Sequence, residues 1–130
     1  MRAVRPQAGS ERESLYSLYR RGVELLEDGD YEEAVPPLAD AARQAPEKTS
    51  VREALGRAYF RTRRFEQAAV EFEAVVERYP VNDYAHFCLG RALSKSGRRD
   101  RARHHLALAA GLRPERPDYR LYRERLAQGW

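Results

Sequence analysis

Residues 49–80 read TSVREALGRAYFRTRRFEQAAVEFEAVVERYP and carry small, aromatic and helix-breaking side chains in an order that recurs on both sides. Within them, Gly56, Phe65, Ala68, Phe72 and Pro80 fit two helices that pack back to back and are joined by a short turn. The same kinds of residue recur about 34 positions earlier and later. They are Gly22, Tyr31, Ala34, Leu38 and Pro46 upstream, and Gly90, Ala102, Leu106 and Pro114 downstream. The segment is therefore the middle copy of a repeat.

This spacing and choice of residues resemble the tetratricopeptide repeat from about Leu15 to about Pro114, and a partial copy follows. The resemblance implies an all-α fold, a right-handed superhelical array of antiparallel helical hairpins with about seven helices. It divides the chain into repeats at about 15–48, 49–82 and 83–116 and a cap helix at about 117–128. We therefore expect residues 10–130 to form one domain.

Small residues are expected where the two helices of a hairpin approach closely, because they leave room for larger neighbours to interdigitate on either side. The predicted pairs are Gly22 with Ala34, Gly56 with Ala68, and Gly90 with Ala102. The chain departs from the family at the position of the first helix that usually holds tryptophan. That column contains Leu18, Arg52 and His86.

The N-terminal boundary is predicted from a capping box. Ser10 and Glu13 have the required spacing, so we expect the first helix to begin near Glu11 and to run to about Asp28. Residues 1–9 are expected to form a disordered arm. The array should end in a cap helix whose Leu121 and Leu126 face the third hairpin.

The second helix is predicted to open with another capping box, Asp30 with Glu33. Pro36 and Pro37 follow one to two turns later and remove two backbone donors. We therefore expect either a bend near residues 32–36 or a helix that becomes regular only after Pro36.

Composition argues for a cytoplasmic protein without a membrane span. No apolar run in the 130 residues is long enough to cross a bilayer, and the first residues do not resemble a secretory signal. Cys88 is the single cysteine, which excludes an intramolecular disulfide. The net charge is +4, but positive and negative residues are mixed along most of the chain, as on ordinary solvated helix faces.

In the family that this chain resembles, the first helix of each hairpin lines a concave surface on which an extended peptide lies. The candidate partner-binding residues are Tyr16, Tyr19, Val23, Glu53, Arg57, Phe60, Arg61, Tyr84, Phe87, Arg91, Lys95, Leu121, Tyr122 and Arg125. Among them, Arg57, Arg91 and Arg125 are spaced one repeat apart. A basic groove lined by aromatic rings suits an acidic segment or a C-terminal carboxylate. We therefore predict a non-catalytic adaptor or scaffold for protein–protein interaction.

Three alternatives compete with this interpretation. The groove arginines could only solvate the inner surface and pair with acids such as Glu53. A nucleic-acid-binding accessory protein would use the arginine-rich C-terminal half instead. That half contains Arg91, Arg98, Arg99, Arg101, Arg103, Arg113, Arg116, Arg120, Arg123 and Arg125. Finally, the acidic first hairpin and the basic last one would allow weak self-assembly into homo-oligomers.

We expect no metal, cofactor or catalytic site. His86 and Cys88 are two residues apart on one helix and point in different directions, and the adjacent His104 and His105 are no better placed. A His86 packed in the tryptophan column is the favoured interpretation. Paired carboxylates lie on predicted exposed helix faces without a cleft that would raise a pKa.

Overall fold

The structure is a computed structural model that describes residues 13–129. Within this range it contains seven helices and no strand. They are α2 (Leu15–Glu27), α3 (Tyr31–Gln44), α4 (Thr49–Arg61), α5 (Phe65–Arg78), α6 (Asp83–Lys95), α7 (Arg99–Leu112) and α8 (Pro117–Ala127). The predicted arm at residues 1–9 and the predicted helix start near Glu11 lie outside the described residues.

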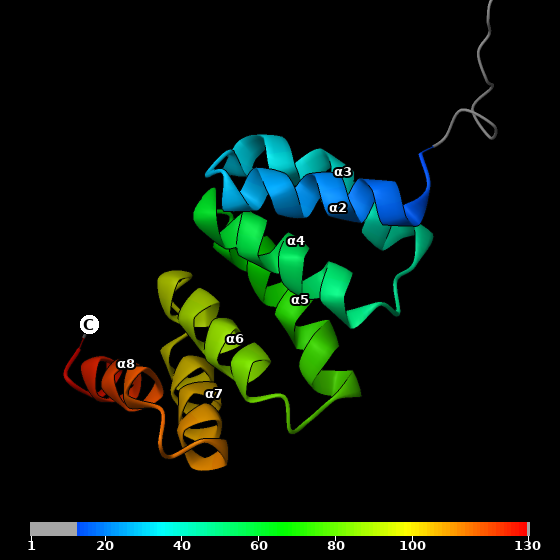
Figure 1. The fold of residues 1–130 in the computed structure, drawn as a ribbon. Coiled ribbons are helices and arrows are strands. Elements are labelled where there is room, and N and C mark those ends of the chain that lie inside the picture. Colours follow the sequence, from blue (N-terminus) through cyan, green and yellow to red (C-terminus); the bar gives the residue numbers. More distant parts are fainter. Residues whose placement is uncertain (1–12, 130) are drawn as a thin grey trace, which may run out of the picture.

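The helices form three antiparallel hairpins, α2–α3, α4–α5 and α6–α7, which stack in sequence order (Figure 1). The second helix of each hairpin packs against the first helix of the next, and α8 packs against α7. The array is all-α and right-handed, as the repeat pattern predicted. Every element therefore buries its apolar face against its neighbours in sequence.

The helix termini partly differ from the predicted ones. Residues 13 and 14 are not helical, and Ser14 caps α2 by accepting a hydrogen bond from the amide of Ser17 at 3.1 Å. The predicted continuous helix through residue 13 is therefore wrong. The predicted box at Asp30 is also wrong, because its side chain makes no capping bond to α3. Asn82 does cap α6, through a 3.0 Å bond from the amide of Ala85.

The two prolines lie inside a helix that is assigned without a break from Tyr31 to Gln44. The predicted helix that becomes regular only after Pro36 is therefore wrong. Pro36 and Pro37 leave the carbonyls four residues earlier without their helical donors. Those carbonyls belong to Glu32 and Glu33, which are exposed, so water can bond to them.

The helices pack closely at the three predicted glycines, but the side chains that contact the glycines are not the predicted alanines. A Cβ built on Gly56 would lie 2.7 Å from Cε2 of Phe72, closer than real side chains approach. The glycine therefore accommodates a ring on the facing helix, and the nearest atoms do not belong to Ala68. In the other two hairpins the nearest side chain is a leucine, Leu38 over Gly22 and Leu106 over Gly90.

The tryptophan column holds a polar network in the second hairpin. Arg52 donates through Nε to the carbonyl of Pro46 at 2.9 Å and through a terminal nitrogen to Glu71 at 2.8 Å. Glu71 lies on α5 and is buried. Arg52 thus connects α4 to its partner helix and to the end of the preceding repeat.

The third hairpin repeats this arrangement with imidazoles. His86 bonds through Nε2 to the carbonyl of Pro80 at 2.7 Å, and its Nδ1 lies 3.0 Å from Nδ1 of His105 on α7. The prediction of a packed His86 is confirmed, since both rings are buried. In the first hairpin the equivalent positions, Leu18 and Pro37, are apolar and buried.

The last helix is held against the third hairpin by both of its ends. Tyr119 is fully buried, and its hydroxyl donates to Asp83 at 2.6 Å. Arg99 at the start of α7 donates to the carbonyl of Leu126 at 2.7 Å. Leu126 is buried as predicted, whereas Leu121 is 44% exposed and the prediction for it was wrong. Tyr119 occupies the inward position instead.

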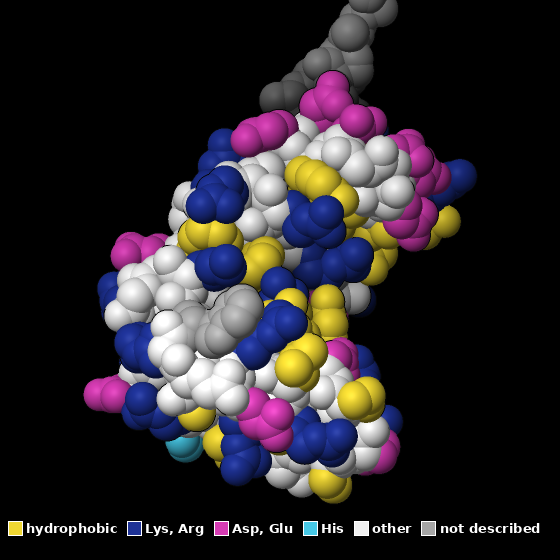
Figure 2. Space-filling model, turned by 90° about the vertical axis from the view of Figure 1, so that its left-hand side faces the viewer, with side chains coloured by type: hydrophobic (Ala, Val, Ile, Leu, Met, Phe, Trp, Pro, Cys, Tyr) yellow, Lys and Arg dark blue, Asp and Glu magenta, His cyan; other side chains and the backbone are white. Residues whose placement is uncertain are grey.

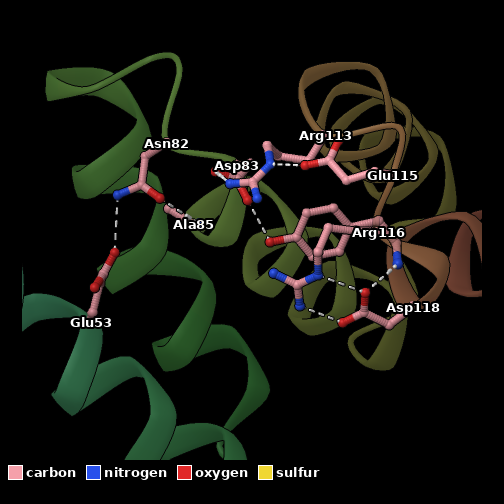
Figure 3. A network of polar contacts seen from close by, with 9 residues as sticks. Glu53, Asn82, Asp83, Ala85, Arg113, Glu115, Arg116 and Asp118 are labelled. Carbon is pink, nitrogen blue, oxygen red and sulfur yellow. Dashed lines mark hydrogen bonds and ion pairs between the residues drawn. The ribbon is translucent and has the colours of Figure 1, made fainter.

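Charged side chains surround this attachment (Figure 3). Arg113 lies 3.9 Å from Asp83 and also pairs with Glu115. Arg116 forms two hydrogen bonds with Asp118, which hold the pKa of that carboxyl below its ordinary value. The arginines before α8 are therefore engaged by nearby acids.

Candidate functional site

The first helices of the second and third hairpins and the cap helix bring three arginines to one surface. Arg57 and Arg91 line one pocket, and Arg91 and Arg125 line the next. Arg91 is common to both pockets. Two arginines that are one repeat apart therefore line each pocket.

The first hollow, which we call the thiol pocket, has a volume of about 160 Å³. It is lined by Leu26, Tyr31, Arg57, Phe60, Arg61, Phe72, Tyr84, Cys88 and Arg91. The second, the cap pocket, has a volume of about 400 Å³. It is lined by Arg91, Ser94, Lys95, Leu106, Tyr122, Arg125 and Leu126.

Basic and apolar side chains alternate on the surface of the molecule. Figure 2 shows one face on which Lys and Arg lie beside hydrophobic side chains across the middle, while Asp and Glu gather at the upper end, over α2 and α3. The arrangement offers an acidic ligand both charge attraction and apolar contact.

The thiol pocket combines exposed cations with buried uncharged side chains, since Arg57 and Arg61 are exposed whereas Leu26 and Phe72 are buried. Tyr84 and Cys88 are one helical turn apart on α6 and both line this pocket. Burial raises the pKa of the Cys88 thiol to about 12 and also raises the pKa of Tyr84. Cys88 therefore stays a neutral thiol at neutral pH, which suits contact with an apolar group and does not suit nucleophilic attack.

Arg91 is held between aromatic rings from three helices. Its guanidinium carbon lies 4.7 Å from the ring centroid of Phe60, 4.6 Å from that of Tyr122 and 5.7 Å from that of Phe87. Its Nε is buried and has no hydrogen-bond partner among residues 13–129. The stacking fixes the guanidinium in place before any ligand arrives, which lowers the entropy cost of binding.

Within residues 13–129, neither Arg57 nor Arg61 forms an ion pair with Glu53. Glu53 accepts a 3.0 Å hydrogen bond from the side chain of Asn82 (Figure 3). Arg61 stacks over Tyr31 at 4.2 Å. Within residues 13–129, the ion pairs do not include Arg57 or Arg91. Pairing with Glu53 therefore does not account for these cations.

The structure gathers eight of the predicted residues around the two pockets. They are Arg57, Phe60, Arg61, Tyr84 and Arg91 at the thiol pocket, with Lys95, Tyr122 and Arg125 joining Arg91 at the cap pocket. The other six line neither pocket. Tyr16 is 70% exposed and Leu121 is also exposed, whereas Phe87 is buried. Tyr19 and Val23 pack against the core of the first hairpin. Glu53 accepts a hydrogen bond from Asn82.

Several pocket residues were not among the predicted ones. They are Tyr31, Phe72, Cys88, Leu106 and Leu126. Cys88 could have been found, because it follows Tyr84 by four residues and shares its helix face. Tyr31, Phe72 and Leu106 come from second helices, whose side chains reach the pockets between the first helices. No pattern within a first helix indicates them.

Neither a metal site nor a membrane-spanning helix is found within residues 13–129. No group of three His, Cys, Asp or Glu side chains there is placed to hold a metal ion. No helix there combines the length and the apolar character needed to cross a bilayer.

Comparison with known proteins identifies related folds. Residues 25–86 match the family model described as Tetratricopeptide repeat. MamA 41-end from Desulfovibrio magneticus RS-1 superposes with a TM-score of 0.85 and 24% identity, over 92% of this chain and 67% of that one. No curated protein sequence matches the chain.

Two further solved structures contain peptides. The first TPR of Spaghetti (RPAP3), bound to the HSP90 peptide SRMEEVD, has a TM-score of 0.81 and 18% identity, over 88% of this chain and 90% of that one. The Yersinia enterocolitica type III secretion chaperone SycD, in complex with a peptide of the translocator YopD, has a TM-score of 0.73 and 18% identity, over 92% of both chains. At these identities the likeness shows the fold.

Proposed function

This chain belongs to the tetratricopeptide-repeat family, and from that premise we propose that it is a non-catalytic adaptor for a segment of a partner protein. The segment would lie across the first helices, over the thiol pocket and the cap pocket. We place the adaptor in the cytoplasm because its single cysteine is a buried, unreactive thiol.

One observation carries this proposal: Arg91 lines both pockets and is held rigidly by three rings. A fixed guanidinium between two hollows can bind a carboxylate while neighbouring groups of the ligand enter on either side. The peptide complexes of the Spaghetti and SycD structures support this use of the fold.

The ligand chemistry follows from the two pocket walls. Apart from its three arginines, the thiol pocket is lined by aromatic rings, a leucine and a thiol, so it suits a small apolar side chain. Lys95 and Arg125 add positive charge at the cap pocket. We therefore propose a segment with an apolar residue close to acidic residues or to a C-terminal carboxylate.

The nucleic-acid alternative is weakened by ion pairing in the C-terminal half. Several of its arginines already contact acids and would have to exchange them for phosphates. The pairs are Arg98 with Glu66, Arg101 with Glu73, Arg103 with Asp100, Arg113 with Glu115 and Arg116 with Asp118.

Charge reversal in the groove tests the adaptor proposal. The variant Arg57→Glu with Lys95→Glu changes two exposed pocket residues and leaves the packed Arg91 in place. The matched control, Arg103→Glu with Arg123→Glu, changes the net charge equally at exposed positions outside both pockets. Cross-linking in an extract of the native source, followed by mass spectrometry, measures which proteins each variant captures.

We expect partners of the wild-type chain to be retained by the control and lost by the groove variant. Both variants should melt close to the wild type, since exposed charges contribute little to folding. Retention by the groove variant would contradict the proposed site. Loss of RNA or DNA binding in the control would favour the nucleic-acid alternative.

A further inference from the structure

The cap pocket gathers positive charge without a negative side chain. Arg91 and Lys95 on α6 and Arg125 on α8 line it, and none of its other four lining residues is acidic. Like charges around one hollow repel one another, and a bound anion relieves that repulsion. The pocket therefore favours an anionic ligand, and it favours a doubly charged anion over a singly charged one.

Two of the three cations are ordered by one aromatic ring. The ring centroid of Tyr122 lies 4.6 Å from the guanidinium carbon of Arg91 and 5.6 Å from that of Arg125. Lys95 is exposed in the last turn of α6. In the part of the chain that the structure describes, neither Arg91 nor Lys95 forms an ion pair. Their charges are therefore available to a ligand.

Two hydroxyl groups add neutral donors to the same pocket. Ser94 and Tyr122 both line it, and both are half-buried. Among the described residues, neither hydroxyl takes part in a hydrogen bond. Each can therefore donate to an anionic oxygen without first breaking a bond within the protein.

A carboxylate would use this set of donors only in part. It has one negative charge and two oxygens that lie in a single plane. A phosphate ester on a side chain has a charge of about −1.5 to −2 near neutral pH and three strong acceptor oxygens. Three cations and two hydroxyls, provided by two different helices, match the larger charge and the tetrahedral shape of the phosphate better.

Size separates the roles of the two pockets. The cap pocket has a volume of about 400 Å³, against about 160 Å³ for the thiol pocket. Apart from its arginines, the thiol pocket is lined by rings, a leucine and a thiol, and so it suits the apolar residue. Because Arg91 lines both pockets, one extended segment can fill the two together.

We propose that the cap pocket binds a phosphorylated serine or threonine of the partner segment, while an apolar residue of the same segment enters the thiol pocket. A short phosphorylated side chain keeps its phosphate close to the backbone of a segment that lies along α6 and α8, the helices that carry the cations. The inference rests on the proposed function, because it names the acidic group that the groove recognises. Binding of the partner then depends on its phosphorylation.

Two degenerate peptide libraries test this assignment without knowledge of the partner's sequence. They differ at one fixed position, which holds phosphoserine in one library and glutamate in the other, and all other positions are random. The peptides are acetylated and amidated, so that no terminal charge contributes. Fluorescence anisotropy measures the affinity of the full chain for each labelled library. We expect the phosphoserine library to bind on the order of tenfold more tightly, because the phosphate accepts more charge-assisted hydrogen bonds.

Charge removal locates the preference. Lys95→Gln with Arg125→Gln removes two cations from the cap pocket and leaves the packed Arg91 in place, so the tenfold preference should largely disappear. The exposed single variant Lys95→Gln should change it in the same direction by a smaller factor. The matched control, Arg103→Gln with Arg123→Gln, removes equal charge outside both pockets and should keep the preference. Equal loss in the control would attribute the preference to net charge and overturn the proposal.

Inorganic phosphate distinguishes a phosphorylated segment from a free anion. It has no apolar neighbour for the thiol pocket, so it should displace the phosphoserine library only at far higher concentration than an unlabelled phosphoserine library does. Displacement at similar concentrations would show that the pocket takes a free anion, and the proposal would be wrong.

The two libraries also separate this inference from the adaptor proposal. If both bind equally well, the groove accepts acidic segments in general, and the phosphate assignment is refuted while the adaptor proposal stands. If neither binds, the phosphate assignment is refuted as well. Capture of native partners by the groove variant then still tests the adaptor proposal by itself.

Discussion

Gly56 offers the sharpest test of how the hairpins pack, because the smallest possible substitution there meets a buried ring. Gly56→Ala would place Cβ 2.7 Å from Cε2 and 2.8 Å from Cζ of Phe72. The Phe72 side chain is only 1% exposed, so it has little room to withdraw. Either the ring rotates against its neighbours or the two helices of the hairpin separate.

Two opposing terms decide the size of the effect. Overpacking a well-filled core costs about 1–3 kcal/mol. Replacing a helical glycine by alanine stabilises the folded chain by about 1 kcal/mol, because alanine has the higher helix propensity. The free energy of unfolding should therefore fall by about 0–2 kcal/mol, and the single variant is hard to interpret without a reference for propensity alone.

Gly111 provides that reference. It lies in α7, is exposed, and would have no atom within 4 Å of an added Cβ. Gly111→Ala should therefore raise the free energy of unfolding by up to about 1 kcal/mol. The difference between the two variants isolates the steric cost, about 1–3 kcal/mol, or about 4–12 °C in melting temperature for a chain of this size.

Urea unfolding followed by circular dichroism measures both variants. The same substitution in a Phe72→Ala background should lose its steric cost, because the ring that Cβ meets is gone. The packing argument is refuted if Gly56→Ala stabilises the chain as much as Gly111→Ala does. It is equally refuted if the cost of Gly56→Ala is unchanged without the Phe72 ring.

Two further predictions concern the pocket and the cap helix. Since burial raises the pKa of Cys88 to about 12, its thiol should react with Ellman's reagent at least about tenfold more slowly in the folded chain than in urea. Equal rates would show that the thiol pocket is open or incorrectly placed. Tyr119→Phe keeps the ring against Phe87 and removes the hydroxyl that donates to Asp83. It should lower the free energy of unfolding by about 1–3 kcal/mol in the same urea assay, and an unchanged midpoint would argue against that bond.

The helices and their order could be predicted because the information is local. Glycine, alanine and proline recur at fixed positions, and each hairpin contacts only its neighbours in sequence. Helices α4 and α6 accordingly begin at Thr49 and Asp83, where the second and third repeats were predicted to begin. The helix ends were predicted less well. A capping box at Asp30 depends on a side-chain rotamer, which residue spacing does not determine.

Long-range side-chain partners could not be predicted in this way. Leu121 and Tyr119 are both apolar candidates on α8, and only the angle at which α8 meets α7 decides that Tyr119 is buried and Leu121 exposed. The same holds for the partner of Gly56, which is Phe72 and not Ala68, because it depends on the offset between the two helices.

The sequence by itself therefore determined the all-α repeat array and the spacing of Arg57, Arg91 and Arg125 along it, because both follow from periodicity. Tertiary structure alone decided that Arg91 is enclosed by three rings and that His86 meets His105. The physical reason is that these contacts join different helices, whose relative rotation is set by the packing of many buried side chains together.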